Sequence, residues 1–422
     1  MDIDTQLKLM DEYSFRTVGQ VMYEYVLWVL TEARKRKFKR LYFLARDGYL
    51  LCEIAKKICY KYSIDIECRY LYCSRYSLRM PSYHLIGEEA FDLLLLNGYY
   101  ITPKTLLMRA ELDSLERSKI YSQLEIHDEN AVLSDYEFGK LADKLKKNES
   151  YRNSVIEKSR AAYKPAINYF RQEKLFENDY ISIVDSGWTG SMQRSLRILM
   201  ESAGYKGKFC GFYFGMYAKP KESTDGEYLN FYFDQDNGIM RKIMFNNNLF
   251  ECMLSAPHGM TLRYECSENI SQPILAEYPE NEMRRLVDHQ IQGALKYAEE
   301  RANTEKFAYS YKKSLKLCYK VLKRAMVFPT ADEVRMYGRF MFCDDVTEGY
   351  HLTLTDENMK QALNDNMLVP RVLRKLFHIK KHTAVSKPLW IYGLTAEYPA
   401  PLRLWYRLNI LAWDILKFIL KR

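Results

Sequence analysis

Short apolar segments that alternate with helical patterns are the feature that most constrains the fold. Four such segments lie at residues 40–45, 66–74, 180–184 and 208–218. Strands that are almost continuously apolar and alternate with helices form parallel sheets covered by helices on both faces. The sequence therefore predicts an α/β fold with a parallel sheet. Ligands of such sheets bind at the carboxyl ends of the strands.

The length of the chain predicts more than one structural unit. At 422 residues it exceeds the usual size of a single hydrophobic core. Residues 1–250 hold the predicted sheet and form an α/β core, within which residues 85–176 are polar and helical in pattern and indicate a helical insertion. We expect residues 251–422 to be a mainly helical C-terminal region that ends in an amphipathic helix. Thr330, in the sequence FPTADEV, has the position of a helix N-cap.

Composition restricts the class of protein. Hydrophobic residues make up 48% of the chain and charged residues 28%, which excludes disordered and fibrous proteins. The nine cysteines form no CxxC pair and mostly lie in apolar runs, as is typical of reduced thiols in the cytosol. We find no secretory signal and no run of about 18 apolar residues, so we predict a cytoplasmic protein without a spanning helix.

The net charge of +9 favours an anionic partner, which could be nucleic acid, a phosphorylated metabolite or anionic lipid. Lysine and arginine are spread along the chain, and the densest run, at residues 34–40, is typical of a solvated helix end. Charge alone does not select among these partners. The motifs described below favour a phosphorylated metabolite, and we predict no nucleic acid partner.

The sequence VDSGWTGS places small residues between a strand and a helix, where free backbone N–H groups and the helix dipole favour an anion such as phosphate. Asp185, at the end of the strand, could accept hydrogen bonds from sugar hydroxyls or hold a metal-bound water. The alternative is a plain helix cap with a tight glycine turn. The predicted anion-binding residues are Ser186, Gly187, Thr189, Gly190 and Ser191.

A second loop of this kind, LARDGYL, follows the segment at residues 40–45. Arg46 could pair with a phosphate, Asp47 could coordinate Mg²⁺ or act as a base, and Gly48 would permit close backbone approach. Arg75 and Arg79, after the second strand, could add pyrophosphate contacts. The alternative is an internal salt bridge between Arg46 and Asp47. Two such loops on one sheet predict a single ligand with two phosphate groups.

The sequence YISIVDSGWTGSMQ resembles the signature of type I phosphoribosyltransferases, in which a strand ends in two acids and a loop containing Thr-Gly leads into a helix. Aligning Thr189 and Gly190 with that Thr-Gly places Asp185 on the second acid, while Val184 stands at the first acid and Met192 at the final Thr. FLARDGYLLCEIA is similar in position to the family's pyrophosphate loop. The resemblance implies phosphoribosyl pyrophosphate as donor and Mg²⁺ as cofactor.

FLARDG and the element D-x-G-W-x-G-S-x-Q also resemble a group of proteins found with bacterial surface-polysaccharide genes, often labelled haloacid dehalogenase-like hydrolases. That group is similar to glycan phosphoribosyltransferases. The resemblance implies transfer of ribose 5-phosphate to a hydroxyl of a lipid-linked glycan, with inversion to a β-ribofuranoside, beside a partner phosphatase and glycosyltransferases. Asp47 and Asp185 are the predicted catalytic residues, and Asp47 is the predicted metal ligand and base.

Two other functions stay open. A phosphatase of the haloacid dehalogenase type needs a nucleophilic Asp and a second Asp two residues later, whereas each loop has one, Asp47 or Asp185. We therefore place a sugar-phosphate phosphatase second. A non-catalytic scaffold in polysaccharide assembly is third.

Two further segments could serve an acceptor. In FECMLSAPHGMTLRY, Glu251 and His258 could orient or deprotonate a sugar hydroxyl, although a lone histidine is more often structural. In the tail, a narrow polar stripe and the anchors Trp405, Trp413 and Phe418 predict a helix lying in the interface of the plasma membrane, on its inner face. The alternative is packing on the protein or on a second subunit. The stripe consists of Arg403, Arg407, Asp414, Lys417 and Lys421.

Overall fold

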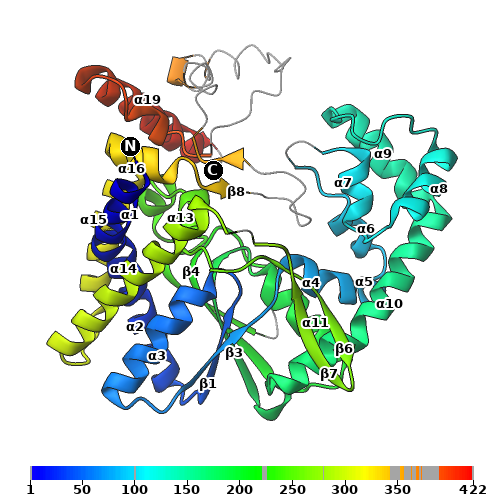
Figure 1. The fold of residues 1–422 in the computed structure, drawn as a ribbon, viewed down its shortest axis with the longest axis horizontal. Coiled ribbons are helices and arrows are strands. Elements are labelled where there is room, and N and C mark those ends of the chain that lie inside the picture. The colour runs from blue at the N-terminus through cyan, green and yellow to red at the C-terminus, as the bar shows by residue number, and fades with distance from the viewer. Residues whose placement is uncertain are drawn as a thin grey trace.

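The computed structural model describes residues 2–98, 101–220, 226–278, 280–342, 352–355, 363, 367–369, 372 and 389–420. A five-stranded parallel sheet of order β2-β1-β3-β4-β5 lies at its centre (Figure 1). This confirms the predicted α/β fold. The strand that follows β1 in the chain, β2, lies on one side of the β1–β3 pair, and the strand that follows β3, β4, lies on the other side. Sheets of this kind bind ligands where the strand order reverses in this way, at the carboxyl ends of β1 and β3. The strands are β1 (Arg40–Leu44), β2 (Glu67–Leu71), β3 (Tyr180–Trp188), β4 (Lys208–Met216) and β5 (Gly226–Phe233).

Helices cover both faces of the sheet. Phe43 and Phe212 pack on the face covered by α2 (Gln20–Lys35), α3 (Gly48–Tyr62) and α15 (Tyr311–Val327). Tyr42 and Ile183 face α10 (Glu149–Gln172) and α11 (Ser191–Ser202). Apolar side chains on both faces are what a strand covered on both sides requires.

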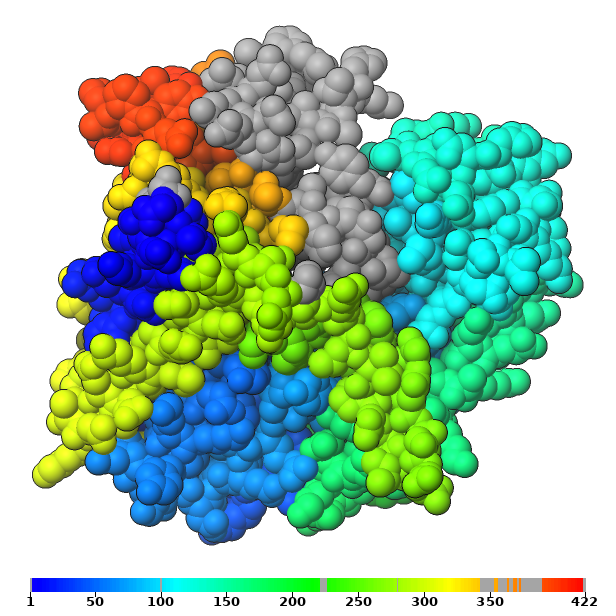
Figure 2. Space-filling model, in the orientation of Figure 1, coloured from blue at the N-terminus to red at the C-terminus, as the bar shows by residue number. Residues whose placement is uncertain are grey.

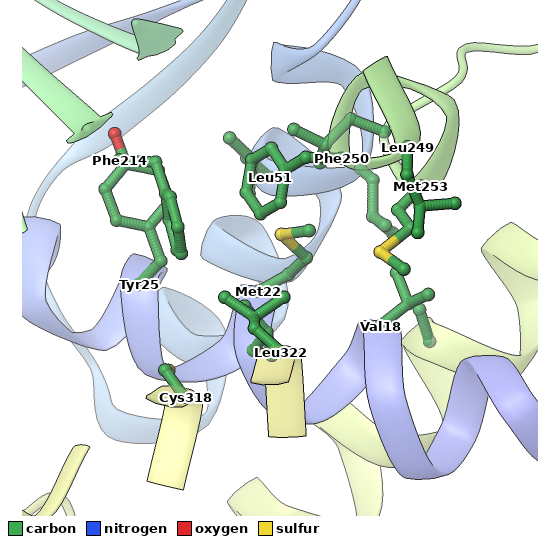
Figure 3. Close-up of a cluster of buried hydrophobic side chains, with 14 of the residues drawn as sticks. Val18, Met22, Tyr25, Leu51, Phe214, Leu249, Phe250, Met253, Cys318 and Leu322 are labelled. Atoms are coloured by element: carbon green, nitrogen blue, oxygen red, sulfur yellow. The ribbon is translucent and has the colours of Figure 1, made fainter. Parts of the chain in front are cut away.

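The core on the α2 side holds several distant segments together. Every residue from 21 to 30 of α2 is buried. Figure 3 shows side chains of α2 meeting those of α3, β4, α15 and α13 (Asn247–Met253). This packing fixes α13, which carries Glu251, relative to the sheet. The labelled residues are Val18, Met22, Tyr25, Leu51, Phe214, Leu249, Phe250, Met253, Cys318 and Leu322.

The segment between β2 and β3 consists of helices joined by turns and loops, with no strand among its described residues, in agreement with the predicted helical insertion. It has a hydrophobic cluster of its own, which includes Phe91, Leu106, Ile120 and Tyr151. Figure 2 shows most of it (cyan) as a lobe beside the rest of the chain. Its helices are α4 (Arg75–Arg79), η2 (Met80–Ser82), α5 (Tyr83–Ile86), α6 (Glu89–Leu94), α7 (Pro103–Met108), α8 (Ser114–Leu124), α9 (Asp135–Lys147), α10 and η3 (Leu175–Glu177).

The C-terminal region is mainly helical, as predicted, but it also contains a hairpin that the sequence did not indicate. β6 (Thr261–Ser267) and β7 (Ile270–Leu275) pair antiparallel and contact α10. Two-residue strands β8 (Met341–Phe342) and β9 (Leu352–Thr353) form a second small pair. No helix within the described part of the chain is long and apolar enough to cross a membrane.

The remaining helices precede β1 or follow β5. Thr330 caps α16 as predicted: its side chain accepts from the backbone of Glu333, whose carboxylate accepts from the Thr330 N–H. These helices are α1 (Ile3–Tyr13), η1 (Ser14–Gly19), α12 (Ile239–Ile243), α14 (Glu282–Thr304), α16 (Ala331–Tyr337), η6 (Gly393–Thr395) and α19 (Ala400–Leu420).

Candidate functional site

The two predicted loops lie next to each other at the carboxyl ends of β1 and β3, which are hydrogen-bonded neighbours. The hydroxyl of Ser186 donates a short hydrogen bond to the carboxylate of Asp47, so the two strand ends are joined directly. The peptide bond between Ala45 and Arg46 is cis. Asp47 is half-buried and Arg46 is exposed. The structure thus brings together the residues that the sequence assigned to two separate loops.

The second strand is longer than predicted. β3 continues to Trp188 instead of ending at Val184, because β4 runs beside it and pairs Asp185 with Tyr213 and Gly187 with Gly215. Asp185 and Ser186 are therefore buried strand residues and not part of a loop. Their positions are fixed by the sheet, which is how a rigid site is held.

Two glycines that we predicted to contact phosphate have structural roles. Gly187 has φ +129°, and a Cβ added there would lie 2.0 Å from the carbonyl oxygen of Gly215. Gly190 has φ +67°, and its Cβ would lie 2.6 Å from the ring of Tyr228. Both glycines permit a backbone path that other residues would not. Their contribution to a ligand is through backbone groups.

Two helices have their N-termini at this site. α3 begins at Gly48, which is buried, and α11 begins at the half-buried Ser191, which follows the exposed Thr189 and the buried Gly190. Neither Asp47 nor Gly190, the N-cap residues, makes a side-chain hydrogen bond to its helix. At α3 the Tyr49 N–H donates to the Arg46 carbonyl at 3.0 Å. The other N–H groups in the first turns of the two helices receive no side-chain cap from these N-cap residues, and the helix dipoles favour an anion at each end.

Three carboxyl groups gather between these helix ends. Burial raises the pKa of Asp47, Asp185 and Glu251, to about 7 for Glu251 and well above the usual range for Asp185. The charge of Asp47 further raises the pKa of both Asp185 and Glu251, so the groups repel one another. A bound cation would relieve this repulsion.

The cluster suits a magnesium ion that is shared with a phosphorylated ligand. Mg²⁺ usually binds one or two carboxylates together with water and substrate phosphates. Across the described residues, no group of three or more His, Cys, Asp or Glu side chains could hold a metal ion by itself. Asp47, the predicted ligand, lies directly before α3 and interacts electrostatically with Asp185 and Glu251.

Trp188 orients Glu251, which sequence reasoning did not foresee. Its indole N–H donates to the Glu251 carboxylate at 2.6 Å. The backbone of Trp188 has φ +120°. Its indole packs against Phe233, Phe245 and Phe250. The tryptophan in the D-x-G-W element was the available signal, but its partner lies on α13, far along the sequence.

Arginine side chains supply positive charge near the three carboxyl groups. Arg75, the exposed first residue of α4, lowers the pKa of Asp47 and Glu251. Arg79 is half-buried, and burial together with the nearby Arg75, Arg109 and Arg194 lowers its pKa. In the described part of the chain, no hydrogen bond or ion pair involves the guanidinium of Arg75 or Arg79. Two such groups beside the N-terminus of α11 favour an anionic ligand.

His258 is held as a structural residue. Its Nδ1 donates to the Gly259 carbonyl at 2.8 Å, so in the neutral ring Nε2 accepts from the hydroxyl of Tyr70, also at 2.8 Å. Burial lowers its pKa, and Arg46 lowers it further. Both ring nitrogens are engaged, so Glu251 is the better candidate for a base.

The raised pKa values predict that stability falls as the pH rises. Glu251 has an ordinary value of 4.5 and a folded value of about 7, so the folded chain binds more protons than the unfolded chain between these values. The free energy of unfolding should therefore decrease by about 1–3 kcal/mol between about pH 5 and about pH 8. Urea unfolding at a series of pH values measures this. Glu251→Gln should show a smaller decrease, and an identical pH dependence in the two proteins would contradict the prediction.

Comparison with known proteins gives no match, either among family models or among curated sequences. The resemblance to phosphoribosyltransferases therefore remains a prediction from the residues quoted above.

Proposed function

We propose that this protein is a phosphoribosyltransferase that moves ribose 5-phosphate from phosphoribosyl pyrophosphate to a hydroxyl of a lipid-linked glycan. The observation that carries the proposal is the pair of open helix N-termini, α3 and α11, at adjacent strand ends with carboxyl groups between them. A ligand that fits is anionic at both ends and carries hydroxyl groups in the middle. Phosphoribosyl pyrophosphate has this form.

The 5-phosphate fits the N-terminus of α11. Backbone N–H groups from Ser191 onward point toward it, and the hydroxyls of Thr189 and Ser191 are at hand as donors. Arg79, which no acid neutralises within the described residues, would complete the contacts. A phosphate here would also relieve the repulsion among Arg75, Arg79 and Arg194.

The pyrophosphate fits the N-terminus of α3. Arg46 and Arg75 interact electrostatically with Asp47 and would lie beside the leaving group. Asp47 would hold Mg²⁺, which when bound neutralises the charge that develops on pyrophosphate. Because Asp47 also accepts from Ser186, this carboxylate is held in place before the donor binds.

Asp185 and Glu251 would serve the ribose and the acceptor. Asp185, buried between the two helix ends, can accept from the ribose hydroxyls. The acceptor oxygen forms a bond to C1 of the ribose while the bond from C1 to pyrophosphate breaks, and pyrophosphate leaves with the electron pair. The acceptor proton moves to Glu251, whose pKa of about 7 suits a general base at neutral pH. We therefore assign the base to Glu251 in place of Asp47.

Trp188→Phe should lower kcat about tenfold while leaving donor affinity unchanged, because the aromatic packing remains but the hydrogen bond to Glu251 is lost. That bond lowers the pKa of Glu251, so its loss should move the acid limb of the pH–rate profile to higher pH by roughly half a unit or more. Steady-state kinetics across pH measure both effects. Tyr217→Phe, in a ring that packs on Trp188, is the matched control and should change neither. An unshifted profile in Trp188→Phe would exclude Glu251 as the base.

A direct assay tests the function. The protein is incubated with phosphoribosyl pyrophosphate, Mg²⁺ and a synthetic lipid-linked acceptor, and we expect pyrophosphate together with an acceptor heavier by one phosphoribosyl group. Phosphate release from a sugar phosphate, without transfer, would support the phosphatase instead. No donor binding, and an unchanged surface glycan in cells carrying Asp185→Ala, would leave the scaffold function.

The chemistry of the product implies its neighbours in the reaction sequence. A transferred ribose 5-phosphate keeps its phosphate, so a separate phosphatase must act before glycosyltransferases extend a ribose at that position. In this proposal the protein works on the cytoplasmic side of the plasma membrane in bacterial surface-polysaccharide synthesis.

A further inference from the structure

The first two residues of the polar stripe of α19, Arg403 and Arg407, face the protein instead of water. Arg407 is 7% exposed, and its guanidinium donates to the hydroxyl of Thr395 at 2.8 Å and to the carbonyl of Pro329 at 3.0 Å. Burial lowers the pKa of Arg407 to about 10. Arg403 donates to the carbonyl of Ala396 at 3.1 Å. Arg403 and Arg407 therefore hold the start of the helix on the protein, which is the alternative that the sequence left open, whereas Lys417 is exposed; Lys421, the last member of the stripe, lies outside the described residues.

The apolar side of the same helix consequently points outward. Five large side chains, which we call the outer face of α19, are between 40% and 61% exposed. Their spacing places them along one side of a helix about 30 Å long. Four of them lie within residues 402–408 and the fifth lies near the end of the helix. A group of large exposed apolar side chains on one helix is unusual on a protein surface that faces only water. The outer face consists of Leu402, Leu404, Trp405, Leu408 and Ile419.

A second copy of the chain is a poor partner for this row alone. A strip about 30 Å long and about 10 Å wide offers roughly 300 Å², whereas a stable protein interface buries about 800 Å² on each partner. A lipid surface needs no matching shape, and a row of leucine, isoleucine and tryptophan is what interfacial helices insert.

The charges around the outer face favour an anionic surface. Asp414 is the one acidic residue of α19, against Arg403, Arg407 and Lys417. Lys417 is exposed, and Lys242 of α12 lies 5.8 Å from the ring of Phe418. The chain as a whole carries a net charge of +9. Lys417 and Lys242 would be attracted to anionic lipid headgroups, whereas Arg403 and Arg407 are held against the protein.

The helix also lies at the end of the molecule that holds the candidate site. α12 follows β5 at the carboxyl edge of the sheet and contacts α19. Figure 1 shows α19 at the same end as α13, the helix of Glu251. A surface bound by the outer face would therefore be near the site.

We propose that the protein docks on an anionic lipid bilayer through the outer face of α19, with Arg403 and Arg407 of that helix held on the protein. The docking is independent of the donor chemistry, so it holds or fails separately from the proposed function.

Co-sedimentation of the full chain with vesicles tests the proposal. We expect binding to vesicles of phosphatidylcholine with about 30% phosphatidylglycerol, weaker binding to phosphatidylcholine alone, and at least about tenfold weaker affinity for Leu404→Ser/Leu408→Ser. These side chains are 51% and 55% exposed, so the variant should keep its melting temperature. Leu115→Ser, at a side chain that is 81% exposed on α8, is the matched control and should bind as the unchanged protein does.

Three results would overturn the docking proposal. The first is no binding to the anionic vesicles. The second is equal binding by Leu404→Ser/Leu408→Ser, which would indicate adsorption by charge alone. The third is a stable dimer in sedimentation experiments that this variant converts to a monomer, which would make the outer face a subunit interface. Binding of phosphoribosyl pyrophosphate should be the same in all these variants, so the outcome is separate from that of the proposed function.

Discussion

Asp185→Asn should reduce phosphoribosyl transfer by at least about a hundredfold while raising the melting temperature. The carboxylate of Asp185 is the acceptor that we assign to the ribose hydroxyls, and an amide cannot replace its charge next to a developing positive centre. The same charge is unfavourable in the free protein, because Asp185 is buried beside Asp47 and Glu251. Removing it should stabilise the fold by about 1 kcal/mol or more, which is roughly 1–3 °C for a chain of this size.

The stability gain has a pH dependence that identifies its cause. As the pH falls toward the ordinary pKa of an aspartate, residue 185 becomes protonated in the unfolded chain as well, so the difference in melting temperature should shrink. Differential scanning fluorimetry and the transfer assay measure the two effects. Asp65→Asn, at a surface ion pair with Lys39, is the control and should alter neither. Loss of both activity and stability in Asp185→Asn would show that this residue serves the fold and not the reaction.

Gly187→Ala should have the largest effect on stability, at least about 3 kcal/mol. The methyl group would lie 2.0 Å from the carbonyl of Gly215, in the middle of the β3–β4 pairing, and the backbone has φ +129°. Relieving the contact requires β3 and β4 to separate, which would move Asp185 and Trp188 as well. Transfer should be lost together with stability.

Gly204→Ala separates the effect of backbone strain from the effect of the steric contact with β4. Gly204 also has a positive φ, +93°, but nothing lies within 4 Å of an added Cβ. This variant carries the backbone strain alone and should lose only about 1 kcal/mol with full activity. Urea unfolding of both proteins gives the comparison. Equal destabilisation by the two substitutions would mean that the close approach of β3 and β4 is not as described.

The parts of the fold that the sequence predicted are those with the strongest periodic signal. β1 and β4 are nearly continuous apolar runs, and such runs belong to strands buried on both faces. β5 and the β6–β7 hairpin were missed, because these are partly exposed strands in which polar residues interrupt the apolar pattern. Their positions depend on pairing with β4 and packing on α10, which are tertiary contacts.

The candidate site shows the same division. The residues at strand ends, Asp47 and Asp185, could be found because the carboxyl edge of a parallel sheet is predictable from strand order in the chain. The contacts between distant segments could not be predicted from the sequence. The Ser186–Asp47 contact depends on the pairing of β1 with β3, and the Trp188–Glu251 contact depends on the packing of α13. The helical wheel of α19 identified a polar stripe and left its orientation open, because the contacts of Arg403 and Arg407 with Ala396, Thr395 and Pro329 are tertiary.

Calorimetric titration with phosphoribosyl pyrophosphate and Mg²⁺ tests the central claim, a site with two separate anion-binding ends, most directly. We predict binding well below about 1 mM, with ribose 5-phosphate and pyrophosphate each binding more weakly than the intact donor. Arg79→Gln, at the α11 end, should weaken binding of ribose 5-phosphate but not of pyrophosphate, and Arg46→Gln, at the α3 end, should do the reverse. No heat of binding from the donor, or equal losses for both fragments in both variants, would contradict the account.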